Sequence, residues 1–403
     1  MTGTVPGARV RRSLATAMTA ASTPRDRADA CPGALQTHAA ADGRLARVRV
    51  PGGALTGAQL RVLATAAREL GDGALELTSR GNVQLRGLPA GAEVELGDRL
   101  AAAGLLPSAT HETARNLLAS VLSGRAGGLL DVRAWVPAFD AGLCADPRLA
   151  ELPGRFLAAF DDGRGDVAGS GADVGLLALD DGTVALLLAG ADSGLRVAPG
   201  EAVALALAAT RAFLDVRAAD GGTAWRVGEL ADGPERIAAA LGAPRAERRP
   251  VPPAPAVGPA GALLQDDGRT ALVAVVPLGR LTAGQAELLA ATGPADLQLT
   301  PWRSVVVPDL PDASASGALA AAGLVLDPSS AWLSVTACAG RPGCAKSLAD
   351  VRGDVVAAVT TGALPAGGAR QHWVGCERRC GRPRGSVVDV VATGSGYRVG
   401  APG

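Results

Sequence analysis

The sequence lacks several features that would assign it to a broad class of protein. No stretch approaches the roughly 18 uninterrupted apolar residues of a membrane span. The 39 basic and 39 acidic residues cancel, and no basic run follows the pattern of a phosphate-binding surface. Six cysteines in 403 residues are far fewer than a disulfide-stapled secreted domain contains. We therefore expect a soluble, cytoplasmic protein that binds neither membranes nor nucleic acids.

Lysine is almost absent, since Lys346 is the one lysine in the chain. Arginine therefore stands at positions where another protein has either lysine or arginine. For this reason a single arginine is a weak indicator of function. Residues 1–27 hold three early arginines ahead of a short, polar stretch, which is too weak for a signal peptide and predicts a disordered tail. The length predicts two to three domains.

Four cysteines near the end of the chain form two short pairs, Cys338-x5-Cys344 and Cys376-x3-Cys380. Four thiolates from two loops are the ligand set of a [4Fe–4S] cluster. Structural zinc prefers two to four residues between paired ligands, so the spacing favours the cluster but leaves zinc open. Two disulfides are the least favoured interpretation of the four cysteines. Each pair follows an expected strand, at 332–335 and 371–374.

The chain contains an internal repeat. Residues 48–60 resemble residues 273–285, and residues 75–85 resemble residues 297–307. Each copy reads as a strand, a helix with a threonine cap and a second strand, which predicts two pseudo-symmetric α+β halves. Between the copies we expect a helix at 113–122, strands at 174–179 and 184–188, and a proline-rich linker at 245–259.

These features together resemble the assimilatory nitrite and sulfite reductase superfamily over most of the chain beyond residue 28. The resemblance rests on the repeats, the cysteine pairs and three further segments at 78–84, 115–116 and 152–156. Within the superfamily, a second set of segments resembles the precorrin-3B synthase family of aerobic cobalamin biosynthesis. This set comprises residues 29–35, 42–43, 51–53, 161–166 and 300–303.

The resemblance implies an α+β fold with duplicated ferredoxin-like halves and two α/β nitrite/sulfite reductase-type domains, the second of them short. It divides the chain after the tail into a first ferredoxin-like half (28–107), a first α/β domain (108–244), the linker (245–259), a second half (260–324) and a cluster-binding α/β domain (325–403).

A tetrapyrrole held between the halves, beside the cluster, is also implied. Arginine suits the carboxylates of such a molecule because a guanidinium makes two parallel hydrogen bonds to one carboxylate. Arg80 and Arg115 fall where the reductases place arginines facing the macrocycle. Further candidates by neighbourhood are Asn82, Gln84, Asn116, Arg155 and Arg303.

One departure separates two branches of the superfamily. The reductases carry two lysines that hold a small anion over the haem iron, and here Arg155 can replace the first but Leu157 cannot replace the second. Reduction of an anion needs that concentrated positive charge. The sequence therefore favours a bound substrate over a resident sirohaem.

The implied reaction is hydroxylation of precorrin-3A at C-20 with O2, accompanied by lactone formation. The glycine-rich segment 169–175 does not fit a dinucleotide fingerprint, so electrons are expected from a ferredoxin or an NAD(P)H-dependent reductase. The family is associated with an additional mononuclear non-haem iron, but His38, His111 and His372 have no ligand-like spacing and no catalytic residue can be named. The alternatives are a sirohaem-dependent sulfite or nitrite reductase and a non-catalytic tetrapyrrole carrier.

Overall fold

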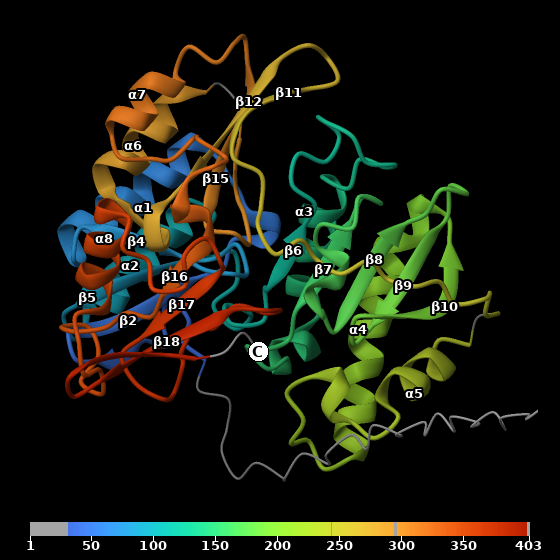
Figure 1. Ribbon diagram of the computed structural model, residues 1–403. Helices are drawn as coiled ribbons and strands as arrows, with labels where there is room; N and C mark the ends of the chain where they lie inside the picture. Colours follow the sequence, from blue (N-terminus) through green and yellow to red (C-terminus); the bar gives the residue numbers. More distant parts are fainter. Residues whose placement is uncertain (1–30, 243, 294–295, 401–403) are drawn as a thin grey trace, which may run out of the picture.

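The structure is a computed structural model that describes residues 31–242, 244–293 and 296–400 (Figure 1). The expected tail at 1–27 lies outside the described residues. The described chain forms four sheets, three of five strands and one of four.

The first sheet has the order β1-β2-β5-β4-β13 and the second the order β11-β12-β15-β14-β3. The strands of the first are β1 (His38–Ala40), β2 (Gly43–Val48), β5 (Val83–Leu88), β4 (Ala74–Leu77) and β13 (Arg280–Thr282). Those of the second are β11 (Gly261–Leu264), β12 (Thr270–Val275), β15 (Ser304–Leu310), β14 (Leu297–Leu299) and β3 (Ala54–Leu55). Their helices are α1 (Gly57–Leu70), α2 (Ala92–Ala102), α6 (Ala283–Thr292) and α7 (Ser316–Ala321).

The two repeats exchange a strand. β13 of the second copy pairs with β4 of the first, and β3 of the first copy pairs with β14 of the second. Helices α1 and α6 pack together, and one continuous apolar core contains residues of both copies. Each helix begins with the same capping box, formed by Thr56 with Gln59 and by Thr282 with Gln285. The predicted duplication is confirmed, and the exchange makes the two halves one packed unit.

The third sheet, green in Figure 1, lies beside this unit and has the order β10-β9-β8-β7-β6. Its strands are β6 (Leu117–Ala119), β7 (Ala158–Asp161), β8 (Val174–Ala178), β9 (Val184–Leu188) and β10 (Ala191–Val197), with helices α3 (Trp135–Ala145), α4 (Ala202–Ala219) and α5 (Gly233–Ala240). The fourth sheet contains β16 (Val335–Ala337), β17 (Gln371–Val374), β18 (Val388–Thr393) and β19 (Gly396–Val399), and α8 (Val351–Thr361) packs on it.

Short 3-10 helices complete the described elements. They are η1 (Pro51–Gly53), η2 (Pro147–Glu151), η3 (Ala168–Ser170), η4 (Pro199–Glu201), η5 (Val227–Glu229), η6 (Pro277–Gly279) and η7 (Ala331–Ser334). Among the helices in the described ranges, none is long and apolar enough to cross a membrane.

Two local expectations are wrong. The predicted helix at 113–122 is a series of turns followed by β6, which pairs in parallel with β7. Its apolar run is too short for periodicity to separate a buried strand from a helix. The predicted strand at 332–335 is mostly η7, and β16 begins only at Val335. The strands expected at 174–179, 184–188 and 371–374 are confirmed as β8, β9 and β17.

Candidate functional site

A cavity of about 550 Å³ lies where the ends of the four sheets meet. This size is typical of pockets for small molecules and cofactors. The walls come from the loop after β4, the start of β7 and the loop after it, the turn at 301–303, residues 332–336 and residues 382–385. Residues 253–259, in a stretch without helix or strand, close another side. The closing segment packs so tightly on Gly169 that a Cβ there would lie 2.2 Å from the Ala254 nitrogen.

Five arginines line this cavity, namely Arg80, Arg303, Arg370, Arg382 and Arg384. Arg382 forms an ion pair with Asp389 at 2.9 Å. Within the described residues, the other four have no carboxylate within ion-pair distance, although most arginines of the chain do. Asp166 is the one acidic residue among those lining the cavity. The cavity wall therefore carries a positive charge that the described chain leaves uncompensated.

Arg80 is held in the turn after β4. The hydroxyl of Thr78 accepts hydrogen bonds from the backbone nitrogens of Arg80 (3.3 Å) and Asn82 (3.1 Å). The guanidinium donates only to backbone carbonyls, at 3.4 Å to Gly154 and 3.0 Å to Arg155. Burial, followed by the nearby charge of Arg226, lowers the pKa of Arg80 to about 10. Arg80 remains a cation at neutral pH, and within the described residues no carboxylate lies at ion-pair distance, although Asp173 acts on it from farther away.

Arg303 occupies the equivalent turn of the second copy and adopts a left-handed φ of 60°. This conformation costs a non-glycine residue energy and is concentrated at functional sites. The turn is braced by a 2.7 Å hydrogen bond between Thr300 and Ser304. No hydrogen bond or ion pair of its guanidinium is found within the described residues, and burial lowers the pKa of Arg303. The cavity therefore offers a complete set of unused donors at this position.

Arg49 is a second buried cation with unused donors, and the sequence analysis did not select it. The residue is 2% exposed, its Nε donates to the Thr113 carbonyl at 3.3 Å, and both terminal nitrogens are buried with no hydrogen-bond partner among those residues of 31–400 that the structure describes. Burial, followed by Arg47, lowers its pKa to about 9, and Arg80 lies within electrostatic range. In the sequence, the position of Arg49 at the end of the repeated strand 48–50 is the one feature that could have marked it as a site residue.

Two predicted ligand residues, Asn82 and Asn116, form a buried link between the first half and the neighbouring domain. Asn82 accepts from Val50 N at 2.9 Å and donates to Asn116 Oδ1 at 3.0 Å. Asn116 donates to the carbonyls of Thr113 and Gly154, each at 3.0 Å. Their amides hold the loops of the cavity in place, and neither residue lines it. A direct ligand contact stays a prediction for both.

Arg115 and Gln84 are also engaged within the protein and lie outside the cavity lining. Arg115 makes two 2.7 Å hydrogen bonds to Asp140 and a third, at 3.0 Å, to the Leu105 carbonyl. Gln84 accepts from Arg47 at 2.5 and 3.0 Å. Their substrate role likewise stays a prediction.

Arg155 and Leu157, which stand where the reductases carry two lysines, lie in two different environments. The guanidinium of Arg155 lies 4.9 Å from the ring centre of Trp225, a cation–π contact, and Arg155 does not line the cavity. Leu157 does line it, next to Leu118 and Val167, and its side chain belongs to a small apolar cluster with both. The wall thus presents hydrocarbon where the reductase pattern has a lysine.

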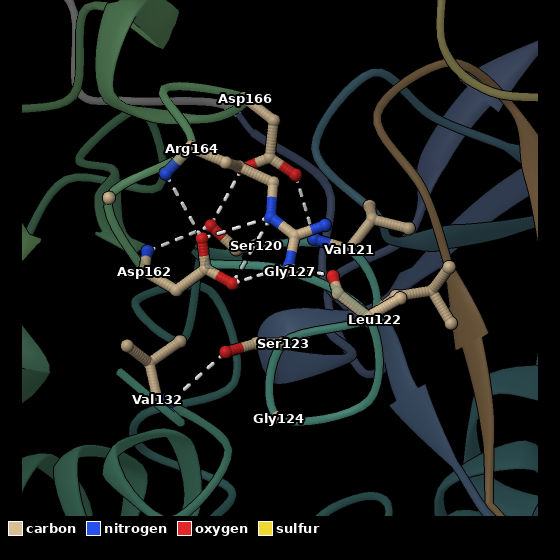
Figure 2. A network of polar contacts seen from close by, with 12 residues as sticks. Ser120, Val121, Leu122, Ser123, Gly124, Gly127, Val132, Asp162, Arg164 and Asp166 are labelled. Carbon is tan, nitrogen blue, oxygen red and sulfur yellow. Dashed lines mark hydrogen bonds and ion pairs between the residues drawn. The ribbon is translucent and has the colours of Figure 1, made fainter. Parts of the chain in front are cut away.

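The end of β7 and the loop after it carry one of the synthase-like segments, residues 161–166, which is built around two buried aspartates. Asp161 accepts hydrogen bonds from four backbone nitrogens between residues 163 and 168, at 2.8 to 3.0 Å. Asp162 pairs with Arg164 through both oxygens (Figure 2). These contacts fix the loop that brings Asp166 to the cavity.

The four C-terminal cysteines lie in the loops after β16 and β17, and none of these four, all within the described residues, forms a disulfide. The Gly375 nitrogen donates to Cys338 Sγ at 3.3 Å. Burial raises the pKa of Cys380, and the other three thiols raise it further, so all four lie within electrostatic range. Backbone donation to sulfur and the mutual electrostatic influence of the four thiols are compatible with a [4Fe–4S] cluster, whose thiolates each bind a different iron. The four cysteines as cluster ligands stay a prediction.

A hydrogen-bonded path joins the cavity wall to these loops. His372 Nε2 donates to the Cys380 carbonyl at 3.1 Å, which leaves Nδ1 to accept from Thr336, a cavity residue, at 2.9 Å. Burial lowers the pKa of His372 to about 4, so the ring is neutral. Both ring nitrogens are engaged, and His372 has no nitrogen left for a metal.

The residues present do not fit the non-haem iron that the family resemblance implied. Within the described residues, no three His, Cys, Asp or Glu side chains are arranged to hold a single metal ion. His38 lies on β1, and the ring nitrogens of His111 contact Ser108, Thr110 and the Asp146 carbonyl. We derive no step through such an iron.

Comparison with known proteins supports the fold and identifies one of its domains. The model of the nitrite/sulfite reductase ferredoxin-like half domain matches residues 38–103. The ferredoxin–nitrite reductase of Synechococcus elongatus is 35% identical over 127 residues, which are 30% of this chain and 25% of that protein. A precorrin-3B synthase of a Sinorhizobium species is 47% identical over 64 residues, which are 16% of this chain and 14% of that protein.

The solved structure of the Mycobacterium tuberculosis NirA protein matches with a TM-score of 0.70 and 22% identity, over 89% of this chain and 75% of that one. The matched segments span a quarter or less of both curated relatives. The chain therefore carries a nitrite/sulfite reductase ferredoxin-like half domain and has the fold of the nitrite and sulfite reductases.

Proposed function

We propose that this protein is a precorrin-3B synthase-like monooxygenase, which hydroxylates precorrin-3A at C-20 with lactone formation, using O2 and electrons from an external reductant. The observation that carries the proposal is the cavity itself. It combines four arginines with no carboxylate at ion-pair distance in the described part of the chain, an apolar wall at Leu157 and a hydrogen-bonded connection to the cysteine loops. The 64-residue match to a precorrin-3B synthase supports the same choice.

The arginines support a polyanionic ligand. A guanidinium has five N–H donors, and one that bonds only to backbone carbonyls still has unused donors. Because its charge is also unpaired, it can bind a carboxylate. A tetrapyrrole with acetate and propionate side chains presents several carboxylates around one apolar ring. Arg80 and Arg303, on equivalent turns of the two copies, would hold carboxylates on two sides of the ring, with Arg370 and Arg384 serving a third. Arg49, behind Arg80, adds positive charge to the same side.

The apolar wall favours a ring over a small anion. Leu157 and Leu118, each 3% exposed, would present their exposed edges to a macrocycle, and Val167 supports them from behind without exposed surface of its own. A site for six-electron reduction of an oxyanion requires concentrated positive charge at the same position. Substrate oxygenation therefore suits this wall better than nitrite or sulfite reduction.

Cys338, Cys344, Cys376 and Cys380 would hold a [4Fe–4S] cluster, which when bound supplies one-electron transfer. The cavity residues would position the ring for electron transfer by placing it against the wall that carries Thr336 and Arg382. Thr336 is two residues from Cys338, and Arg382 is two residues from Cys380. The electron donor is proposed to be a ferredoxin or an NAD(P)H-dependent reductase.

A second candidate is a sirohaem-dependent nitrite or sulfite reductase, favoured by the longer match to a ferredoxin–nitrite reductase. Anaerobic purification with iron, sulfide and porphyrin analysis separates the two. The proposed synthase yields cluster absorption without an extractable haem, whereas the reductase yields stoichiometric sirohaem. A non-catalytic carrier would bind the tetrapyrrole and leave it unchanged with reductant and air.

A further inference from the structure

The easily oxidised aromatic residues of this chain are concentrated in one small apolar cluster between the fourth sheet and α8. The chain holds five tryptophans and one tyrosine, and three of these six residues pack there. Trp373 is a buried member of the cluster, and Trp332 and Tyr397 pack against it, as does Cys338. All four phenylalanines, by contrast, are buried in the core of the third-sheet domain. Where the chain needs only aromatic bulk, it uses phenylalanine.

One end of this aromatic group lies at the cavity. Trp332, in η7, lines the cavity. Gln371, the first residue of β17, lines it too, and Trp373 lies two residues farther along the strand, on the same face of the sheet. Two strand residues span about 7 Å. One indole therefore lies on the cavity wall, and a second lies a short distance behind that wall.

The other end of the group reaches the surface. The ring centres of Trp373 and Tyr397 are 4.9 Å apart, with the rings edge-on at 66°. Trp373 is 5% exposed, whereas Tyr397, on β19, is partly exposed. The Tyr397 hydroxyl donates a 2.6 Å hydrogen bond to the carboxylate of Asp354 on α8. The phenol thus combines contact with a buried indole, access to solvent and a hydrogen-bonded proton acceptor.

The indole of Trp373 carries a polar group that packing does not require. Its Nε1 is buried, with no hydrogen-bond partner in the described part of the chain. A buried donor left unpaired costs free energy, and phenylalanine would fill an apolar position without that cost. Indole adds ease of one-electron oxidation, a property that it shares with phenol and that the phenyl ring lacks.

We propose that Trp332, Trp373 and Tyr397 form a relay that carries oxidising equivalents from the cavity to the protein surface. The inference rests on the proposed function, which brings O2 and one-electron chemistry into the cavity. The relay would remove an oxidant that forms there without reacting with the substrate, before it damages the cavity wall and the neighbouring cysteine loops.

The electrons and protons of this relay balance in two steps. A one-electron oxidant of the oxygen-radical class takes an electron from Trp332, which recovers one from Trp373, which in turn recovers one from Tyr397. The O–H bond of Tyr397 breaks, its proton passes to Asp354, and a neutral tyrosyl radical remains. A thiol or ascorbate in solution then supplies one electron to the radical, and Asp354 returns the proton.

The test uses uroporphyrin, a metal-free octacarboxylate porphyrin, as a light-driven oxidant in the cavity of the full chain. Illumination with pentaamminechlorocobalt(III), an irreversible electron acceptor, converts the bound porphyrin to its cation radical. Electron paramagnetic resonance of samples frozen under illumination should show a tyrosyl radical. That radical belongs to Tyr397, because the chain has one tyrosine. Trp373→Phe should largely abolish the signal, since it interrupts the path between the cavity and the phenol.

Trp135→Phe is the matched control. Trp135 packs against the core of the third-sheet domain, with its ring edge-on to Phe160 at 6.2 Å, so its loss should leave the tyrosyl yield unchanged. Asp354→Asn should lower the yield, because the phenol loses its proton acceptor. Thermal unfolding and porphyrin titration check that each variant is folded and binds the porphyrin as the unaltered protein does.

Absence of a tyrosyl radical in the unaltered, porphyrin-loaded protein would overturn the relay and leave the proposed function standing. An unchanged yield in Trp373→Phe would also overturn it, since Tyr397 would then be oxidised directly from solution. If Trp373→Phe does not fold, Trp332→Phe at the cavity end provides the same comparison. Failure of the unaltered protein to bind uroporphyrin would instead contradict the proposed function, and this inference with it.

Discussion

The guanidinium of Arg86 donates a 2.8 Å hydrogen bond to the carbonyl of Gly343, the residue that precedes Cys344. The same side chain pairs with Asp42 through two 2.9 Å hydrogen bonds, and its side chain is 8% exposed. A buried arginine of the first ferredoxin-like half therefore anchors one of the proposed cluster loops. Asp42 belongs to the synthase-like segments of the sequence, and this contact gives it a structural role.

Replacing Arg86 by methionine should loosen the cysteine loop. The change leaves Asp42 without its buried partner, whereas Glu76 keeps its ion pair with Arg352 at 2.5 Å. Breaking a buried pair costs about 3 kcal/mol. We expect a lower free energy of unfolding in urea and less iron per chain after reconstitution. Arg68→Ala, which removes a half-exposed ion pair with Glu287, is the matched control and should cost less than about 1 kcal/mol. Full iron content and unchanged stability in Arg86→Met would contradict the anchor.

Serine substitution at Cys338, Cys344, Cys376 or Cys380 should each abolish or strongly reduce the broad visible absorption of an iron–sulfur cluster. A hydroxyl is a poor ligand for cluster iron compared with a thiolate. Cys144→Ser is the control, because Cys144 packs against an apolar core away from these loops. Iron and sulfide analysis with electron paramagnetic resonance provides the readout. Stoichiometric zinc in place of iron would favour the structural zinc site that the spacing left open.

Replacing Arg303 by methionine should weaken binding of an octacarboxylate porphyrin by about 10- to 100-fold, since a charge-assisted hydrogen bond contributes about 1.5 to 3 kcal/mol. Stability should stay the same or rise, because the change removes a buried cation without a partner among the described residues. Arg155→Met tests the other expectation from the sequence. Arg155 lies on Trp225 and outside the cavity, so its loss should change porphyrin affinity less than threefold. The reverse order of effects would contradict this arrangement of the site.

The raised pKa of Asp166 predicts a pH-dependent difference in stability. The carboxyl titrates at 3.8 in the unfolded chain and at about 6 in the folded protein. Between these values only the folded state holds the proton, so this group's contribution to stability falls as pH rises from about 4 to about 6 and stays constant above. Asp166→Asn removes that loss. Asparagine offers one acceptor oxygen to the two donors, Ser120 Oγ and Val121 N, so the variant loses a contact at every pH. Relative to the unaltered protein, we expect its stability to rise by up to ~3 kcal/mol between pH 4 and pH 8.

Urea unfolding of both proteins at several pH values measures this difference. Because other groups titrate identically in the two proteins, the difference between them isolates Asp166. A variant that is destabilised equally at every pH would show that the carboxylate supports the fold rather than opposing it.

The sequence predicted the repeated part of the fold well because its local signals agree with its tertiary structure. The capping threonines Thr56 and Thr282 mark equivalent helices, and the strands around them have clear boundaries. The exchange of β3 and β13 between the copies was not predictable. Two equivalent strands have the same local pattern whether each pairs within its own copy or with the other, and only packing decides between the two arrangements.

The candidate site was predicted in part. Arg80 and Arg303, two of the candidates from the sequence, line the cavity, and the ligand role of both stays a prediction. In a chain that uses arginine for almost every cation, the sequence cannot separate Arg115, bound to Asp140, from Arg49, whose terminal nitrogens are unused. Arg370 and Arg384 were missed for the same reason, because their lack of a carboxylate partner is a property of the folded protein.

Incubation of the anaerobically purified protein with precorrin-3A, a ferredoxin-type reductant and O2, followed by mass spectrometry, tests the proposed function most directly. The proposal predicts a product that gains one oxygen atom, and ¹⁸O2 should label it. An unchanged tetrapyrrole, together with reduction of nitrite or sulfite by a sirohaem-containing preparation, would contradict the account.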